Sequence, residues 1–108
     1  QHHKAPNTSS RVEIKTVLDG MAKFEYRGNM RLEHMAPGSN AYQENKNLVI
    51  GQQAKAISIP SLEVRHNEVQ CGHGSAIFYI DEDHLFYLAM RGIDEPKAKR
   101  MIVEGFIK

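Results

Sequence analysis

The residues of this chain best suited to chemistry are Cys71 and His73, which lie two positions apart. Side chains two apart in an extended strand project from the same face, with their Cβ atoms roughly 6–7 Å apart. Both can therefore reach one metal ion or cluster. A closed metal site usually has about four protein ligands. The pair is thus half a site, and a second chain is the natural source of the remaining ligands.

The plainer interpretation of Cys71 is a core residue, because free cysteine is among the most buried residue types. Val69 shares its strand face, which favours an inward position. The neighbouring glycines, Gly72 and Gly74, are suited to a bulge or tight corner, to the close approach of a partner backbone, or to both. The remaining histidines are scattered and fit solvated or capping roles better than a zinc site: His34, His66 and His84.

Enzyme motifs are missing from the sequence. There is no nucleophile elbow, no glycine-rich phosphate loop and no H-E-x-x-H motif. A cysteine nucleophile needs a neighbour that stabilises its thiolate, and His73 can serve as one. A cysteine-dependent enzyme or a stand-alone metal-binding β-domain therefore stays open as an alternative, as does a purely structural β-solenoid.

The amino-acid composition limits the classes of partner that this chain is expected to bind. A net charge of +1 and an isoelectric point near 8.1 argue against a nucleic-acid or anionic-membrane surface. One cysteine excludes an internal disulfide and favours a reducing, cytoplasmic setting. No apolar run approaches the roughly 18–20 residues of a membrane span. The polar start without a methionine suggests a fragment of a longer protein.

Residues 11 to about 80 alternate between apolar and polar types in short runs, which predicts β-strands. Turn residues separate the runs at Gly20, Gly28, Gly38, Gly51 and Asn67. Short strands at this spacing are typical of a sandwich, a barrel or a β-solenoid. The pattern alone favours a sandwich or barrel slightly, and Asp19–Gly20 is a good hairpin signal.

After Ile80 the pattern changes to two short helices that form an αα-hairpin. Asp81 and Asp94 are suitable N-caps, Gly92 is placed to end the first helix, and Gly105 is predicted to end the second. Two short helices cannot bury all their apolar residues against each other. We therefore expect a partner groove on the following residues, of types favoured at interfaces: Phe86, Tyr87, Met90 and Phe106.

Five segments in order resemble the SufB/SufD family of iron–sulfur cluster assembly scaffolds. Residues 1–11 resemble its H-x-x-A-P-x-T-x-S-R segment, residues 41–48 its A-Y-Q-x-N-x-N-L segment, and residues 71–74 the C-S-H-G segment of the SufD type. Residues 85–93 and 102–106 resemble the C-terminal helices of the family. This resemblance makes His2 and His3 native residues rather than the remnant of a tag.

The resemblance implies a right-handed parallel β-helix (solenoid) with a short C-terminal helical hairpin. Residues 1–80 would be the C-terminal part of the β-helix core, and residues 81–108 a helical subdomain that docks SufC, an ATPase of the ABC type. The core would pair with a second SufB/SufD-like protomer as a heterodimer or homodimer. Cys71 and His73 would contribute to a transient iron–sulfur or sulfur site at that interface, with no stably bound cofactor and no catalytic residue.

The sequence also departs from the SufB type. Glycines rather than glutamates flank His73, and Asn45 stands where SufB-type sequences carry a cysteine. The chain is therefore nearer the SufD type. Within a solenoid, Asn45 and Asn47 suit a stacked asparagine ladder better than ligand binding.

Overall fold

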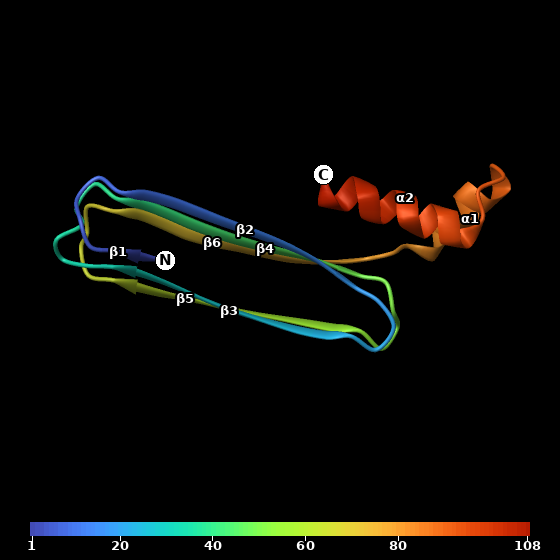
Figure 1. The fold of residues 1–108 in the computed structure, drawn as a ribbon, viewed down its shortest axis with the longest axis horizontal. Coiled ribbons are helices and arrows are strands. Elements are labelled where there is room, and N and C mark those ends of the chain that lie inside the picture. The colour runs from blue at the N-terminus through green and yellow to red at the C-terminus, as the bar shows by residue number, and fades with distance from the viewer.

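A computed structural model describes all of residues 1–108 and shows a mainly β chain with two helices at its C-terminal end (Figure 1). The molecule is elongated, with extents of 58 × 24 × 15 Å. The elements in chain order are β1 His2–His3, β2 Ser9–Leu18, β3 Lys23–Leu32, β4 Asn40–Val49, β5 Lys55–Val64, β6 Gln70–Tyr79, α1 Glu82–Met90 and α2 Glu95–Ile107.

Consecutive strands alternate between two three-stranded sheets, ordered β1-β3-β5 and β2-β4-β6. Every neighbouring pair is parallel and in unbroken register. The predicted stacking of short parallel strands is therefore confirmed. The local hairpin signal at Asp19–Gly20 does not produce a hairpin, because this turn is a corner that carries the chain from β2 in one sheet to β3 in the other.

The corners follow most of the predicted turn residues. Gly20 and Gly38 adopt φ angles of +63° and +73°, a region that favours glycine. Gly51 and Asn67 lie in bends between strands. The corner predicted at Gly28 is wrong, because Gly28 lies within β3. A Cβ at this position would fall on the Gln43 amide oxygen and the Tyr26 hydroxyl, so the glycine makes room for their contact.

The space between the sheets is apolar at its two ends and polar in its middle. Leu18, Val49 and Ala54 form one small apolar cluster, and Met30, Leu32 and Ala41 form the other. Three amide side chains are buried between these clusters: Gln43, Asn45 and Asn47.

The buried amides bond to one another and to nearby groups rather than stacking from coil to coil. The Tyr26 hydroxyl donates to Gln43 Oε1 at 2.6 Å. Asn47 Nδ2 donates to Asn45 Oδ1 at 2.9 Å, and the Thr16 hydroxyl donates to Asn47. The register neighbours of Asn45 are Ile14 and Ser75, so no asparagine ladder forms and that prediction is wrong. The amides serve the fold by satisfying each other in a narrow interior.

The helical hairpin begins and turns as predicted. Asp81 Oδ1 accepts from the Asp83 amide, and Asp94 Oδ1 accepts from the Lys97 amide, both at 2.9 Å. Gly92 follows α1 with a φ of +85°. The helix end predicted at Gly105 is wrong, because α2 continues to Ile107. An isolated glycine is tolerated in a helix at a cost of about 1 kcal/mol.

A contact beyond Gly105 accounts for the longer helix. The rings of Phe106 and Phe78 meet edge to face with centroids 6.0 Å apart, which holds the end of α2 against β6. Lys15 Nζ also donates to the carbonyl oxygen of Lys108 at 3.1 Å. Tertiary contacts thus outweigh the local glycine signal.

Candidate functional site

Cys71 and His73 lie on β6, in register with Ala41 and Gln43 of β4. Because β6 pairs with β4 without a bulge, the two side chains project from the same face of one strand. That face points into the space between the sheets, where Ala41 and Gln43 are buried. The strand therefore aligns the two candidate ligands as the sequence spacing predicts.

The two side chains have different surroundings. Cys71 is half-buried and, with Val69, packs against the apolar cluster of Met30, Leu32 and Ala41. His73 is exposed. The thiol is thus held by packing, whereas the imidazole is accessible from outside the chain.

The chain supplies too few ligands to close a metal site. No three His, Cys, Asp or Glu side chains among residues 1–108 are grouped so that they can hold a metal ion. Cys71 and His73 provide two donors, one soft and one borderline, which suit iron, zinc or copper better than magnesium or calcium. A complete site needs further donors from outside residues 1–108.

The interior is open next to this pair. β5 and β6 are the edge strands of the two sheets, and no further strand follows them. Three inward-facing apolar side chains near these edges remain 40–44% exposed: Leu62, Val64 and Ile77. This end of the β-structure therefore presents apolar surface, unpaired strand edges and the two candidate ligands together.

Gly72 and Gly74 do not form a bulge or a corner, so that interpretation is wrong. Both lie on the outward face of β6, beside the ring of Tyr42. A Cβ at Gly74 would lie 2.8 Å from the Tyr42 hydroxyl oxygen, whereas a Cβ at Gly72 would lie 3.6 Å from the ring. The Arg11 guanidinium covers Tyr42, 4.9 Å from its centroid. The lack of a side chain at Gly74 therefore leaves room for the Tyr42 hydroxyl.

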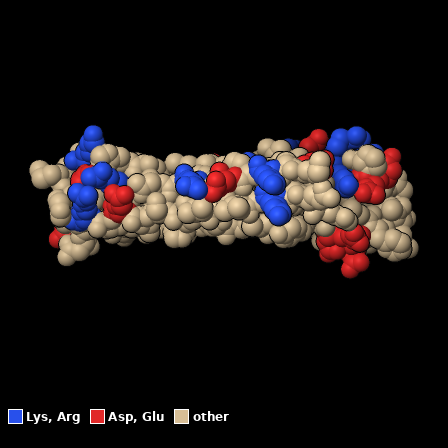
Figure 2. Space-filling model, turned by 90° about the horizontal axis from the view of Figure 1, so that it is seen from below, with Lys and Arg blue, Asp and Glu red and all other residues tan.

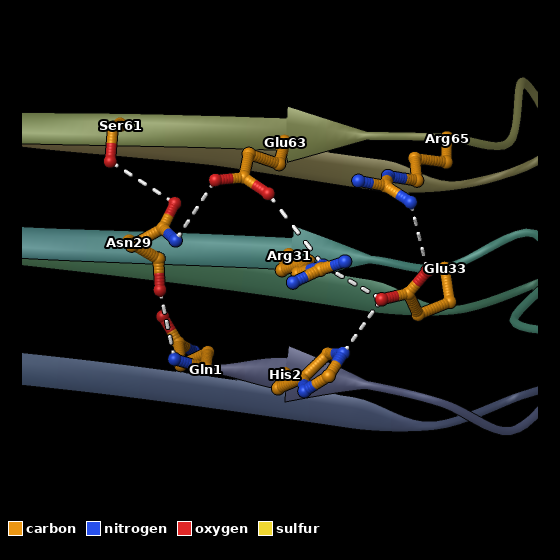
Figure 3. Close-up of polar contacts among 8 residues, drawn as sticks. All are labelled: Gln1, His2, Asn29, Arg31, Glu33, Ser61, Glu63 and Arg65. Atoms are coloured by element: carbon orange, nitrogen blue, oxygen red, sulfur yellow. Dashed lines mark hydrogen bonds and ion pairs between the residues drawn. The ribbon is translucent and has the colours of Figure 1, made fainter.

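A second polar site, absent from the sequence-based predictions, lies on the outward face of β1, β3 and β5 (Figure 3). Glu33 is its centre. His2 Nε2 lies 2.9 Å from Glu33 Oε1, Arg31 Nε lies 2.7 Å from the same oxygen, and Arg65 lies 3.8 Å from Glu33 Oε2. The sequence contains a signal that could have indicated this site. Arg31 and Glu63, and likewise Glu33 and Arg65, are oppositely charged residues that lie 32 positions apart, the spacing between β3 and β5.

The surroundings of Glu33 lower the pKa of its carboxyl group. The hydrogen bond from His2 is the largest cause, and partial desolvation opposes it. The positive charges of Arg31 and Arg65 lower the pKa further. These contacts fix β1 and β5 to either side of β3, so the cluster stabilises the sheet.

The predicted partner surface divides into exposed and engaged residues. Phe86, Tyr87 and Met90 of α1 are 67%, 53% and 74% exposed. The Arg91 guanidinium lies 4.8 Å from the centroid of the Tyr87 ring. Phe106 is half-buried and contacts Phe78, as described above. The freely accessible apolar surface is therefore on α1.

The remaining surface shows no region of one charge sign in the view of Figure 2, where basic and acidic side chains lie beside each other at both ends. Several pairs form ion pairs, such as Arg27 with Glu25 at 3.1 Å. Neither helix has the length and apolar character required to cross a membrane.

Comparisons with known proteins give consistent matches. A sequence model of the SufBD core domain, described as SUF system FeS cluster assembly, matches residues 1–106. An iron–sulfur cluster assembly SufBD family protein of Staphylococcus aureus is 36% identical over 106 residues, which are 98% of this chain and 23% of the relative. A protein of the same description from Mycobacterium tuberculosis is 33% identical over 98% of this chain and 12% of the relative. The chain thus spans less than a quarter of the length of these relatives.

Proposed function

Because the chain belongs to the SufBD family of iron–sulfur cluster assembly proteins, we propose that it is part of a non-catalytic scaffold that works in the cytoplasm. Its β-structure would be the last part of a right-handed β-helix core over residues 1–80. Parallel strands joined by a crossover connection are right-handed in about 98% of cases. The single reduced cysteine suits a cytoplasmic setting.

The scaffold pairs with a second SufB/SufD-like protomer at the open end beside β5 and β6. The observation that carries this proposal is the half-site formed by Cys71 and His73 next to unpaired strand edges. Exposed strand edges are templates for pairing with another chain. A partner there would cover Leu62, Val64 and Ile77 and bring its own donors to the two side chains.

The pair serves as a transient site for an iron–sulfur cluster or sulfur, which is cargo rather than a resident cofactor. Glycines flank His73, and Asn45 is engaged in interior hydrogen bonds, which supports a role of the SufD type. Since one chain groups only two donors, a stand-alone metal-binding domain fits less well.

The helical subdomain, residues 81–108, docks an ATPase of the SufC type. Phe86, Tyr87 and Met90 form the accessible contact surface, and Phe106 positions α2 on the sheet. Large aromatic side chains carry much of the energy in protein interfaces.

Sedimentation velocity of the chain with and without the ATPase subunit tests this function. We expect a complex with the wild-type chain. Changing Phe86→Ala and Tyr87→Ala together should weaken it by roughly tenfold or more. Met35→Ala is the matched control, because Met35 is 73% exposed in the turn between β3 and β4. No complex, or equal affinity for all three chains, would contradict the proposed docking.

A further inference from the structure

Gly72 is the residue that joins the two candidate ligands, Cys71 and His73, along β6. The angle at which the two side chains reach a common ion therefore depends on the backbone dihedrals of this glycine. Glycine has no Cβ to restrict those dihedrals, and a glycine inside a strand weakens the strand. β6 is also an edge strand that pairs only with β4. By itself, this segment would hold the two donors loosely.

The ring of Tyr42 covers the glycine segment from the outward face. Tyr42 is the register neighbour of Gly72 on β4. Two of its ring carbons lie 3.6 and 3.8 Å from the position of a Cβ at Gly72, and its hydroxyl oxygen lies 2.8 Å from the position of a Cβ at Gly74. The ring thus extends along β6 from one glycine to the next. An aromatic side chain on a neighbouring strand stabilises glycine at a sheet edge in this way.

Charged side chains of the same sheet face contact the ring and one another. The Arg11 guanidinium of β2 lies 4.9 Å from the centroid of the Tyr42 ring, a cation–π distance. Arg11 Nη2 lies 3.5 Å from Glu44 Oε2, and Lys46 Nζ lies 3.3 Å from Glu44 Oε1. The ring therefore contacts both the edge strand β6 and a side chain of β2, and it links the edge strand to the rest of the sheet.

We propose that Tyr42 is a positioning residue for the pair of Cys71 and His73. Its ring fixes the backbone of Gly72 and Gly74 from the outward face, and it thereby holds the two donors on the inward face at a constant separation. This inference rests on the proposed function of the pair as a transient cluster or sulfur site, and it adds a residue that sets the geometry of that site. Residues that orient metal ligands typically change metal affinity by about 10–100-fold when they are mutated.

Titration of the reduced chain with cobalt(II) tests the geometry of the pair, because a thiolate–cobalt bond absorbs in the near ultraviolet. Wild type should bind cobalt(II) more tightly than Cys71→Ser or His73→Ala. Tyr42→Ala should weaken binding by roughly tenfold or more, whereas Tyr42→Phe keeps the ring and should stay within about twofold of wild type. Tyr79→Ala is the matched control, because Tyr79 is 71% exposed at the other end of the same strand.

The variant Gly74→Ala displaces the ring without removing it. The new Cβ would meet the Tyr42 hydroxyl, so cobalt(II) binding should weaken. Adding Tyr42→Phe should restore binding, because phenylalanine lacks the oxygen that the Cβ meets. Circular dichroism checks the fold of each variant, and this pair of variants decides if Tyr42→Ala does not fold. No loss in Gly74→Ala, or no recovery in the double variant, would count against the proposed role of the ring.

Amide exchange in β6 gives a measurement that does not depend on metal binding. The Gln70 amide donates to the Ser39 carbonyl, just before β4. Because hydrogen-bonding direction alternates along a strand, the amides of Gly72 and Gly74 also point to β4. In Tyr42→Ala these two amides should exchange roughly tenfold faster than in wild type. Unchanged exchange would show that the ring does not fix this segment and would overturn the inference.

The cobalt titration separates failure of this inference from failure of the proposed function. A wild-type chain that binds cobalt(II) no better than Cys71→Ser and His73→Ala would contradict the proposed site, and the inference with it. Equal affinity of wild type and Tyr42→Ala, or equal losses in Tyr42→Ala and Tyr79→Ala, would overturn the inference alone. Faster exchange with unchanged cobalt(II) affinity would make Tyr42 a purely structural residue.

Discussion

At the scale of single residues, glycines make room for the aromatic hydroxyls of this narrow β-structure. Gly28 leaves space for the Tyr26 hydroxyl and the Gln43 amide, and Gly74 leaves space for the Tyr42 hydroxyl. Because glycine most often marks turns, the sequence predicts a corner at Gly28. The partners that require these glycines lie on neighbouring strands, so no local pattern reveals them.

The substitution Gly28→Ala tests the interior packing. Its Cβ would fall on the hydrogen-bonded pair of Gln43 and Tyr26, and we expect the free energy of unfolding to decrease by roughly 1–3 kcal/mol. Gly72→Ala is the control, because its Cβ would make an ordinary 3.6 Å contact with Tyr42, and it should change stability by less than about 0.5 kcal/mol. Denaturant unfolding measures both, and similar losses would show that Gly28 is not required by this contact.

The Glu33 cluster predicts a pH dependence. The pKa of Glu33 is lower in the folded chain than in the unfolded chain, so its contribution to stability is complete above the ordinary glutamate range. That contribution is lost as the pH falls through the depressed pKa. Wild type should therefore exceed Glu33→Gln in stability near neutral pH, and the difference should shrink in acid. A difference that is constant or that grows in acid, measured by unfolding at several pH values, would contradict this.

At the scale of elements, the sequence predicts strands well where the interior is apolar and poorly where it is polar. In β4 the apolar alternation is visible only near Leu48, because the inward residues Gln43, Asn45 and Asn47 are polar amides. In β6 the alternation is interrupted by Gly72 and Gly74, which carry no side chain. The helical hairpin, by contrast, is predicted from local capping residues and forms from them. Only the end of α2 differs from the prediction, because its contact with β6 joins residues far apart in the sequence.

The substitution Phe106→Ala tests how α2 is held on the sheet. Losing the half-buried ring should cost about 1 kcal/mol of local stability and speed amide exchange in the last turns of α2 roughly fivefold. Ile107→Ala is the control, because Ile107 is 58% exposed. Equal exchange in both variants would mean that the contact with Phe78 does not fix the helix.

At the scale of the whole molecule, the sequence predicts the fold and the candidate site to different extents. Strand periodicity alone left a sandwich, a barrel and a solenoid open, and the resemblance to a family selected parallel strands. The spacing of Cys71 and His73 correctly predicts that they share a strand face. What these residues do not supply is the remaining ligands of a closed site, because no three donors are grouped among them.

The open end beside β6 is therefore the part of the molecule on which the proposed function depends. Docking of an ATPase would use the separate helical hairpin, and exposed α1 residues lie on that hairpin rather than on the strands. Changes to Cys71 or His73 should leave the hairpin intact.

The most direct measurement is the yield of iron–sulfur cluster on the reconstituted assembly of this chain with its second protomer and ATPase. Cys71→Ser and His73→Ala should each reduce the yield, with unchanged circular dichroism and unchanged ATPase binding. Each substitution removes one donor from β6, so a cluster site would lose affinity. Wild-type yields from both variants would contradict the account and make Cys71 a core residue of a purely structural β-domain.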